Sequence, residues 1–249
     1  MVYIDVHCHI DMYSDEELPA IIERARKAGV GIIVNNGINA ETNRKTLGLI
    51  EKYDDIKGAM GIYPCEALNM KDGEIEREIE FIRSNKDKIV AIGEVGLDFK
   101  EDGKEHVKQE RVFRKMIELA KELDKPIIVH SRKAEERCIE ILEEMKVQKV
   151  MMHCFSGKLK LVERIRDNGW FFSIPANVKN SEQFQNIVKM VDIKQLLCET
   201  DSPFLHPDRE KNNEPANVVV SYEMIAKIKN LKLKEVEKQI EKNYRKLFE

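Results

Sequence analysis

The sequence predicts an α/β protein, a single-domain (β/α)8 TIM-type barrel that spans residues 1–249. Eight short β-branched runs alternate with longer segments of helical spacing, and each run is followed by such a segment. No internal repeat, low-complexity tract or Pro/Ser-rich linker divides the chain. Eight strand–helix units joined by right-handed crossovers close into a barrel, and an open, doubly wound sheet is the alternative architecture.

The predicted strands are short and almost continuously hydrophobic, as expected of parallel strands that are covered on both faces. They occupy residues 3–6, 31–34, 56–62, 89–92, 126–129, 149–152, 170–174 and 195–198.

The predicted helices show apolar stripes at helical spacing, with charged residues on the opposite face. The first stripe consists of Leu18, Ile21, Ile22 and Ala25. Comparable stripes lie within residues 117–123 and 139–145, and glycines 29 and 169 are expected to end helices. Helices over residues 218–229 and 233–248 are expected to close the fold.

The composition argues against several classes of protein. Lysine and arginine number 42 and aspartate and glutamate 45, so the net charge is −3 with neutral histidines. This balance disfavours a broad basic face for nucleic acid, although a local basic rim or a bound cation can still hold a phosphate. No apolar run approaches the roughly 18–20 residues that cross a bilayer, and the first residues lack the pattern of a signal peptide. Five scattered cysteines without CxxC pairing favour reduced thiols and a cytoplasmic location.

Six side chains with metal-binding chemistry are predicted to lie at the carboxyl ends of strands. They are His7 and His9 on the first strand, Glu94 on the fourth, His130 on the fifth, His153 on the sixth and Asp201 on the eighth. Parallel barrel strands direct their carboxyl ends at one mouth, where barrel enzymes keep their catalytic residues. The alternative interpretation is a coincidence of structural polar groups that pack or cap at strand ends.

The His-x-His pattern has a geometric meaning. Residues two apart on a strand share a face, so His7 and His9 are expected to point inward and Cys8 outward. Four histidines, one glutamate and one aspartate are too many ligands for one four-coordinate ion. They suit two ions that share a bridging carboxylate, and Glu94 is the natural bridge because its strand lies between the two histidine groups.

Five sequence blocks resemble the signature blocks of the TatD family of metal-dependent deoxyribonucleases, which belongs to the amidohydrolase superfamily. They are residues 7–9 (HCH), 93–98 (GEVGLD), 128–132 (IVHSR), 153–157 (HCFSG) and 199–205 (ETDSPFL). The similarity continues in order to residues 213–217 (NEPAN), so it covers nearly the whole chain.

The resemblance implies a site and a substrate. By similarity, His7, His9 and Asp201 hold one divalent ion, His130 and His153 hold the other, and Glu94 bridges them. The implied substrate is DNA, whose phosphodiesters members of the family hydrolyse as exonucleases. The sequence does not distinguish Zn, Mg or Mn as the metal: histidine ligands suit zinc, whereas phosphodiester hydrolysis often uses magnesium or manganese.

The chain departs from the family pattern in three places around the substrate. Residues 61–65 read GIYPC where many members have Gly-x-His-Pro-His, so Tyr63 and Cys65 replace two histidines. Phe99-Lys100 stands in place of an aromatic pair, and Asn212 in place of an arginine. We expect the metal chemistry to be retained and the substrate specificity to be affected.

The expected mechanism is hydrolytic. Two cations would bring the pKa of a water molecule near neutrality, since one zinc ion lowers it to about 7. Asp201 is the candidate base for that proton, Glu94 the bridging catalytic carboxylate, and the resulting hydroxide would attack phosphorus in line. Asp98 is expected to orient a ligand histidine, with helix N-capping or a hydrogen bond within its loop as the alternative.

Substrate binding is expected to be local and weakly sequence-specific. The guanidinium of Arg132 is predicted to bind a phosphate through bidentate hydrogen bonds, with a salt bridge to a neighbouring helix as the alternative. The backbone N–H groups of Ser156 and Gly157 are predicted to receive phosphate oxygens. Lys133, Lys158 and Lys160 are further candidate positive charges for DNA binding. A few such local charges are expected to hold a single-stranded DNA end without a broad basic face.

Two rival functions remain open. The same metal site can hydrolyse a small amide, lactone or ester, as elsewhere in the amidohydrolase superfamily. The second rival is a metal-binding scaffold that has lost catalysis. The altered block at residues 61–65 is the only sequence feature that favours it. Neither a membrane nor an obligate protein partner is predicted.

Overall fold

Eight parallel strands follow one another around a single sheet in chain order, in a computed structural model that describes residues 2–100, 106–209 and 212–249. The strands are β1 (Tyr3–Cys8), β2 (Val30–Asn36), β3 (Ile56–Met60), β4 (Ala91–Gly96), β5 (Ile127–His130), β6 (Val150–Met152), β7 (Phe171–Pro175) and β8 (Leu196–Glu199). Because the order never reverses, the sheet has no switch point of the doubly wound kind. The predicted (β/α)8 barrel is confirmed, and the open-sheet alternative is wrong.

The barrel closes between β8 and β1 through bonds at its carboxyl end. The N–H of Asp201 donates to the carbonyl of His7 (2.9 Å), and the N–H of His9 donates to the carbonyl of Ser202 (2.7 Å). Lower in the seam, the Tyr222 hydroxyl accepts the N–H of Ile4 at 2.9 Å. The segments that carry three of the six candidate ligands are therefore fastened directly to each other.

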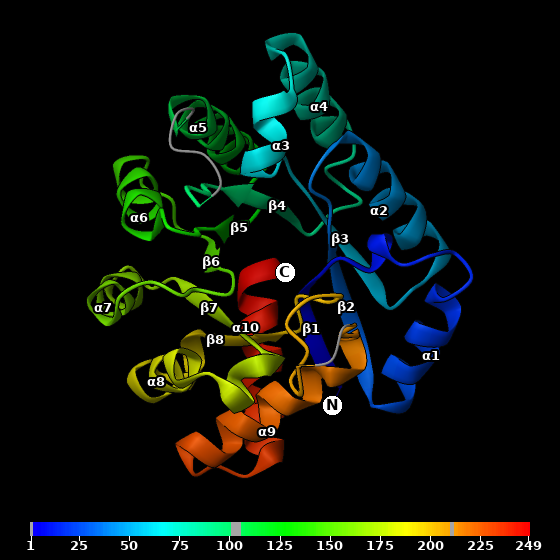
Figure 1. The fold of residues 1–249 in the computed structure, drawn as a ribbon, viewed down its shortest axis with the longest axis vertical. Coiled ribbons are helices and arrows are strands. Elements are labelled where there is room, and N and C mark those ends of the chain that lie inside the picture. Colours follow the sequence, from blue (N-terminus) through cyan, green and yellow to red (C-terminus); the bar gives the residue numbers. More distant parts are fainter. Residues whose placement is uncertain (1, 101–105, 210–211) are drawn as a thin grey trace.

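A ring of helices surrounds the strands (Figure 1). The helices are α1 (Leu18–Lys27), α2 (Ala40–Lys52), α3 (Pro64–Asn69), α4 (Asp72–Ser84), α5 (His106–Glu122), α6 (Glu135–Glu144), α7 (Leu159–Asp167), α8 (Glu182–Met190), α9 (Val218–Lys229) and α10 (Leu233–Phe248). The apolar stripe predicted for the first helix is the buried face of α1. The predicted closing helices coincide with α9 and α10. Burial of such stripes against an apolar sheet stabilises the barrel.

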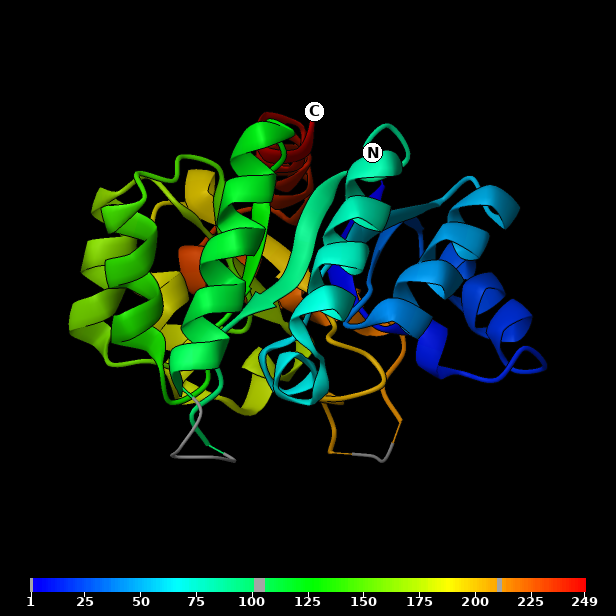
Figure 2. The same cartoon turned by 90° about the horizontal axis from the view of Figure 1, so that it is seen from above.

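The end of the barrel opposite the candidate ligands is covered by α10. Asn243 of α10 donates from its side-chain amide to the carbonyls of Ile193 and Leu196 (2.7 Å each), at the start of β8. Figure 2 shows both termini on one side of the molecule and the segment that follows β8, in gold, on the other. The mouth is thus free of the terminal helix. Among the described helices, none combines the length and the apolar character that a bilayer crossing needs.

The main difference from the prediction is the position of β4, which runs over Ala91–Gly96 and not over residues 89–92. Gly93, Glu94 and Gly96 interrupt the apolar pattern on which the prediction depended, yet all six residues of the strand are buried. Gly96 has a φ of 143°, and a Cβ there would lie 2.0 Å from the carbonyl oxygen of His130. Only glycine fits this close approach of β4 to β5. Glu94 therefore lies within a strand and not after it.

Candidate metal centre

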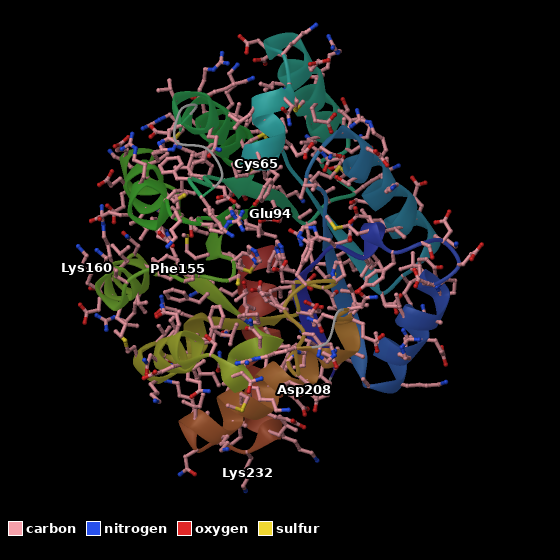
Figure 3. All side chains as sticks on the ribbon, viewed as in Figure 1. Cys65, Glu94, Phe155, Lys160, Asp208 and Lys232 are labelled. Atoms are coloured by element: carbon pink, nitrogen blue, oxygen red, sulfur yellow. The ribbon has the colours of Figure 1, made fainter. Side chains whose placement is uncertain are left out.

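The six candidate ligands come together at the carboxyl end of the barrel. His7, Glu94 and His130 lie on β1, β4 and β5, whereas His9, His153 and Asp201 directly follow or nearly follow β1, β6 and β8. Figure 3 shows Glu94 near the middle of the ring of helices. The side chains of His7 and Glu94 are almost fully buried, at 0% and 4% exposed. The predicted convergence on one mouth is what the structure contains.

Four donor atoms surround one point on the β1/β8 side of Glu94. Nε2 of His7 and Nε2 of His9 are 3.3 Å apart, and they lie 3.5 and 3.2 Å from Oε2 of Glu94. Oδ1 of Asp201 lies 3.6 Å from each of these nitrogens. Four ligand atoms around one tetrahedral zinc ion, at about 2.0–2.2 Å from it, are about 3.3–3.6 Å apart from each other. The spacing of these donors fits a single divalent ion.

The other oxygen of Glu94 faces the second group of ligands. Oε1 of Glu94 lies 2.8 Å from Nδ1 of His130 and 3.7 Å from Nε2 of His153. Each oxygen of this one carboxylate thus meets its own pair of imidazoles, which is the arrangement expected of a carboxylate that bridges two ions. The imidazole and carboxylate donors suit a divalent transition metal. The donor set therefore fits the implied metals.

Hydrogen bonds behind the ligands hold three of the imidazoles in place. Nδ1 of His9 is 2.9 Å from the carbonyl oxygen of Asn36, and Nδ1 of His153 is 2.9 Å from Oε2 of Glu199. Nε2 of His130 is 3.2 Å from Oδ2 of Asp98. Each contact leaves the opposite ring nitrogen directed at Glu94. Partners of this kind select the tautomer and the orientation of a metal-binding histidine.

Two buried acids of this outer layer, Glu199 and Asp5, were not predicted as site residues. Glu199 also accepts a hydrogen bond from the Ser173 hydroxyl at 2.6 Å. Asp5 accepts the backbone N–H groups of Thr200 at 2.9 Å and of His7 at 3.3 Å, and also the Thr200 hydroxyl. Asp5 thereby joins the segment of His7 to the segment of Asp201. An acid inside an otherwise apolar predicted strand was the available signal for Asp5.

We expect Glu199→Gln to weaken metal binding about 10- to 100-fold, the usual cost of losing an outer partner of a ligand histidine. The substitution keeps the volume of the side chain but removes the charge that orients His153. Isothermal titration with Zn²⁺ measures the effect. Ser173→Ala, which removes only the hydroxyl that donates to Glu199 and leaves the carboxylate in place, serves as the milder comparison. Equal affinities for wild type and Glu199→Gln would contradict this role.

Burial and mutual contact shift the pKa values of the centre in opposite directions. Burial lowers the pKa of His7 to about 4, with a further contribution from nearby His153. Burial also disfavours charge on His9, but the hydrogen bond to Glu94 and the negative charges of Glu94 and Asp201 together outweigh burial and raise the pKa of His9 to about 9. For His153, burial is outweighed only by the combined charges of Glu199, Asp201 and Glu94 and the hydrogen bond to Glu199, which raise its pKa to about 10. Burial raises the pKa of Asp201 to about 6.

These shifts predict that metal binding releases protons. At pH 7 the raised pKa values of His9 and His153 leave both imidazoles protonated in the metal-free protein, and an imidazole binds a metal only when its ligand nitrogen is unprotonated. Metal affinity should therefore fall as pH falls below about 10, where His153 is protonated, and more steeply below about 9, where His9 is protonated as well, by about tenfold per pH unit for each proton displaced. Titration calorimetry in two buffers of different ionisation enthalpy counts the protons, and a count of zero at pH 7 would contradict the prediction.

A cavity of about 450 Å³ opens on the centre, within the size range of small-molecule sites. Its lining includes Glu94, His130, His153, Asp201, His9, Arg132 and Tyr63, together with Met12, Ile38, Phe204 and Leu205. A cavity of similar size, about 460 Å³, lies beside α1 and α2 and is lined by none of the six ligands. The first cavity is therefore the one through which a substrate reaches the centre.

Of the predicted substrate contacts, Arg132 is the one that lines the cavity. Arg132 lines the cavity and donates from Nε (2.8 Å) and Nη2 (2.7 Å) to Oδ2 of Asp98. Among the described residues, this salt bridge joins Arg132 to a residue that follows β4. Asp98 also accepts the Tyr63 hydroxyl at 3.0 Å, so it orients His130 and also anchors the wall of the cavity. A phosphate contact of Arg132 stays a prediction.

Ser156 and Gly157 are not among the residues that line the cavity. Helix α7 begins at Leu159, so both precede its first turn, and the carbonyl of Gly157 accepts a hydrogen bond from Gln183 at 2.6 Å. Their predicted role as phosphate donors gains no support from this position. Lys160 lies on the outer side of α7, away from Glu94 in Figure 3, next to Glu136 at 3.8 Å. A substrate contact of Lys160 at the centre is therefore not supported either.

Comparison with known proteins places the chain in a family. A family model described as TatD related DNase matches residues 4–249. The chain belongs to the TatD family. The predicted recognition is thereby confirmed, together with the class of metal-dependent hydrolases to which this family's members are assigned.

Individual relatives match this TatD-family chain along nearly its whole length. It is 39% identical to the uncharacterized metal-dependent hydrolase MJ1582 of Methanocaldococcus jannaschii, over 99% of this chain and 96% of that protein. It is 34% identical to the human deoxyribonuclease TATDN3, over 98% of this chain and 94% of the human protein. The crystal structure of YJJV, a TatD homolog from Escherichia coli K12, superposes with a TM-score of 0.93 at 26% identity, covering 99% of this chain and 97% of that one.

Proposed function

We propose that this TatD-family chain is a deoxyribonuclease that hydrolyses DNA phosphodiesters at a dinuclear metal centre, with residues 1–249 acting as one hydrolase unit. The proposal is supported above all by Glu94, each of whose oxygens lies near its own pair of imidazoles. The proposed ligands are His7, His9, Glu94 and Asp201 for one ion, and Glu94, His130 and His153 for the other. The name of the human relative supports DNA as the substrate.

Divalent cations bound in this centre would neutralise charge on phosphate oxygens and lower the pKa of a nearby water molecule. The protein's own contribution starts with Asp201, which we propose as the acceptor of the proton from the attacking water. Its side chain is 14% exposed against 4% for Glu94, and it lines the cavity. Asp201 is thus the carboxylate of the centre that lies closest to solvent.

Other residues position these groups and the substrate. Glu94 is held by contacts with all four histidines, and Asp98 ties His130, Tyr63 and Arg132 to one carboxylate oxygen. We propose that Arg132, whose side chain is 37% exposed, places its positive charge beside a phosphate of the substrate. Tyr63 stands where many members of the family have a histidine, and its hydroxyl donates to Asp98. We propose that this bond holds Asp98 in the position in which it contacts His130 and Arg132.

The number and identity of the metals and the form of the DNA belong to the same proposal. We propose two ions per chain, with Zn, Mg and Mn as the candidates. We propose single-stranded DNA ends as the substrate and no obligate protein partner. A cytoplasmic location is consistent with five cysteines that are scattered along the sequence without CxxC pairing.

One panel of assays tests the proposed function. The purified chain, loaded in turn with Mg²⁺, Mn²⁺ or Zn²⁺, is given end-labelled single-stranded DNA, the matching duplex, and a set of small esters, lactones and amides. We expect metal-dependent shortening of the single strand from an end. Hydrolysis of a small ester or amide without DNA cleavage would favour the rival amidohydrolase activity. A metal-loaded chain that hydrolyses nothing in the panel would favour the non-catalytic scaffold.

A further inference from the structure

The cavity over the metal centre has walls of two chemical kinds, which come from different arcs of the barrel. The polar residues Tyr63 and Arg132 follow β3 and β5. The apolar residues Met12, Ile38, Phe204 and Leu205 follow β1, β2 and β8. Because β8, β1 and β2 are neighbours around the barrel, these apolar residues all come from one arc of its rim. A ligand that fills the cavity therefore meets charge on one side and hydrocarbon on the other.

Phe204 is the most exposed member of the apolar wall. The residue is 51% exposed to solvent, and Met12 is 42% exposed. Large apolar side chains with such exposure are few among the described residues, and these two line the same cavity as the metal ligands. An exposed apolar patch beside polar groups marks a binding site more often than a packing defect.

The exposure of Phe204 does not come from a loosely attached loop. Its N–H donates to the carbonyl of Asp201 at 2.8 Å, and the carbonyl of Pro203 accepts the N–H of Asn213 at 3.0 Å. Ser202, two residues before Phe204, accepts the N–H of His9 across the barrel seam through its carbonyl. The backbone of residues 202–204 is thus fastened by hydrogen bonds, and the ring is presented in a fixed place.

The ring also lies next to the metal centre. The centroids of the Phe204 and His9 rings are 6.3 Å apart, with an interplanar angle of 68°. Nε2 of the same His9 lies 3.2 Å from Oε2 of Glu94. A flat group that covers the Phe204 face is therefore a direct neighbour of the atoms that would contact the scissile phosphate.

We infer that Phe204, with Met12 on the same wall, forms a stacking shelf for an unpaired nucleobase next to the scissile phosphate. The inference rests on the proposed function and names the part of the DNA that this wall recognises. The two chemical parts of a nucleotide match the two walls of the cavity: the anionic phosphate suits the polar wall, and the flat aromatic base suits the apolar wall. Every base has a π-face, so a shelf without hydrogen-bonding groups accepts all four bases and selects for strands whose bases are not covered by duplex stacking.

The test compares two single-stranded substrates of equal length. One is an ordinary oligonucleotide, and in the other a tetrahydrofuran abasic residue replaces every nucleoside, which makes the comparison independent of strand polarity. We expect Phe204→Ala to lower kcat/KM on the ordinary strand by about 5- to 150-fold, which corresponds to the 1–3 kcal/mol of stacking on one base. On the abasic strand the same variant should stay within about twofold of wild type, because no base is present to stack.

Three further variants complete the design. Phe204→Trp should retain the activity of wild type on the ordinary strand, whereas Phe204→Leu, which keeps an apolar side chain without a π-face, should lose it. Leu231→Ala is the control: Leu231 is 37% exposed in the turn between α9 and α10, and its truncation should leave kcat/KM unchanged on both strands. An equal loss on both strands in Phe204→Ala, or full activity in Phe204→Leu, would overturn the inference.

A binding measurement without turnover separates this inference from the proposed function. The only tryptophan of the chain, Trp170, is 2% exposed and gives a constant background. In Phe204→Trp kept metal-free with a chelator, the ordinary strand should quench the new fluorescence and the abasic strand should not. If wild type hydrolysed neither strand, the proposed function would fail. The fluorescence measurement would then still show whether Phe204 stacks on a base. Equal quenching by both strands, or none by either, would overturn the shelf.

Discussion

Replacing Glu94 by glutamine is expected to remove both metal ions from the purified protein and to lower DNA hydrolysis by at least about 10³-fold, because several kcal/mol of charge stabilisation is lost. The reason is that each oxygen of Glu94 faces a different group of ligands. A glutamine keeps the size of the side chain but offers one oxygen and one NH₂ group, so it cannot serve both sides as an anion. Without the carboxylate, the four imidazoles would bring two cations together with too little negative charge.

Elemental analysis of the dialysed protein measures this effect, with circular dichroism as the check on folding. Glu78→Gln is the matched control, since Glu78 is also a buried glutamate, 2% exposed, that interacts with Asn43 and Arg44 outside the metal centre. We expect the control to keep its metal content. A folded Glu94→Gln protein that still holds two ions per chain would contradict the bridging role.

Asp201→Asn is expected to lower kcat by about 10²- to 10⁴-fold, the usual contribution of a general base, while at least one ion is retained. Asparagine keeps an oxygen near the nitrogens of His7 and His9, where Oδ1 of Asp201 lies at 3.6 Å, but it cannot accept a proton. The second group of ligands, around His130 and His153, is unchanged. The expected result is a metal-binding protein with little turnover.

The control for this variant is Asp124→Asn, which makes the same substitution at a second aspartate with positive φ. The φ values are 54° for Asp201 and 52° for Asp124, so both sites meet the same backbone preference. Asp124 is paired with Lys149 just before β5 begins, at the other end of the barrel. A near-native kcat in Asp201→Asn would remove Asp201 from the role of base.

Much of the fold was predictable because strands covered on both faces need apolar residues almost everywhere. That requirement makes runs such as the one in β5 visible in the sequence, and the order of eight such runs leaves few topologies. The convergence of the ligands was predictable for the same reason, since parallel strands bring their carboxyl ends together. Strand β4 was misplaced because Gly93, Glu94 and Gly96 serve the site and the contact with His130, and not the apolar pattern.

The outer layer of the site could not be read from the sequence. Glu199 acts through His153, on a loop two strands away, and Asp5 acts through Thr200, which is 195 positions along the chain. Such pairings depend on the closed barrel and leave no local pattern. Arg132 shows the same limit: its position after a ligand suggested a phosphate contact, but only the fold reveals that Asp98 shares the guanidinium.

Anomalous diffraction from crystals of the zinc- or manganese-loaded protein locates the metal ions themselves. We expect two anomalous peaks, one on each side of Glu94. The first should be bonded to His7, His9 and Asp201 and the second to His130 and His153, with one oxygen of Glu94 on each. A single peak, or two peaks that do not share Glu94, would contradict the dinuclear centre from which the proposed chemistry follows.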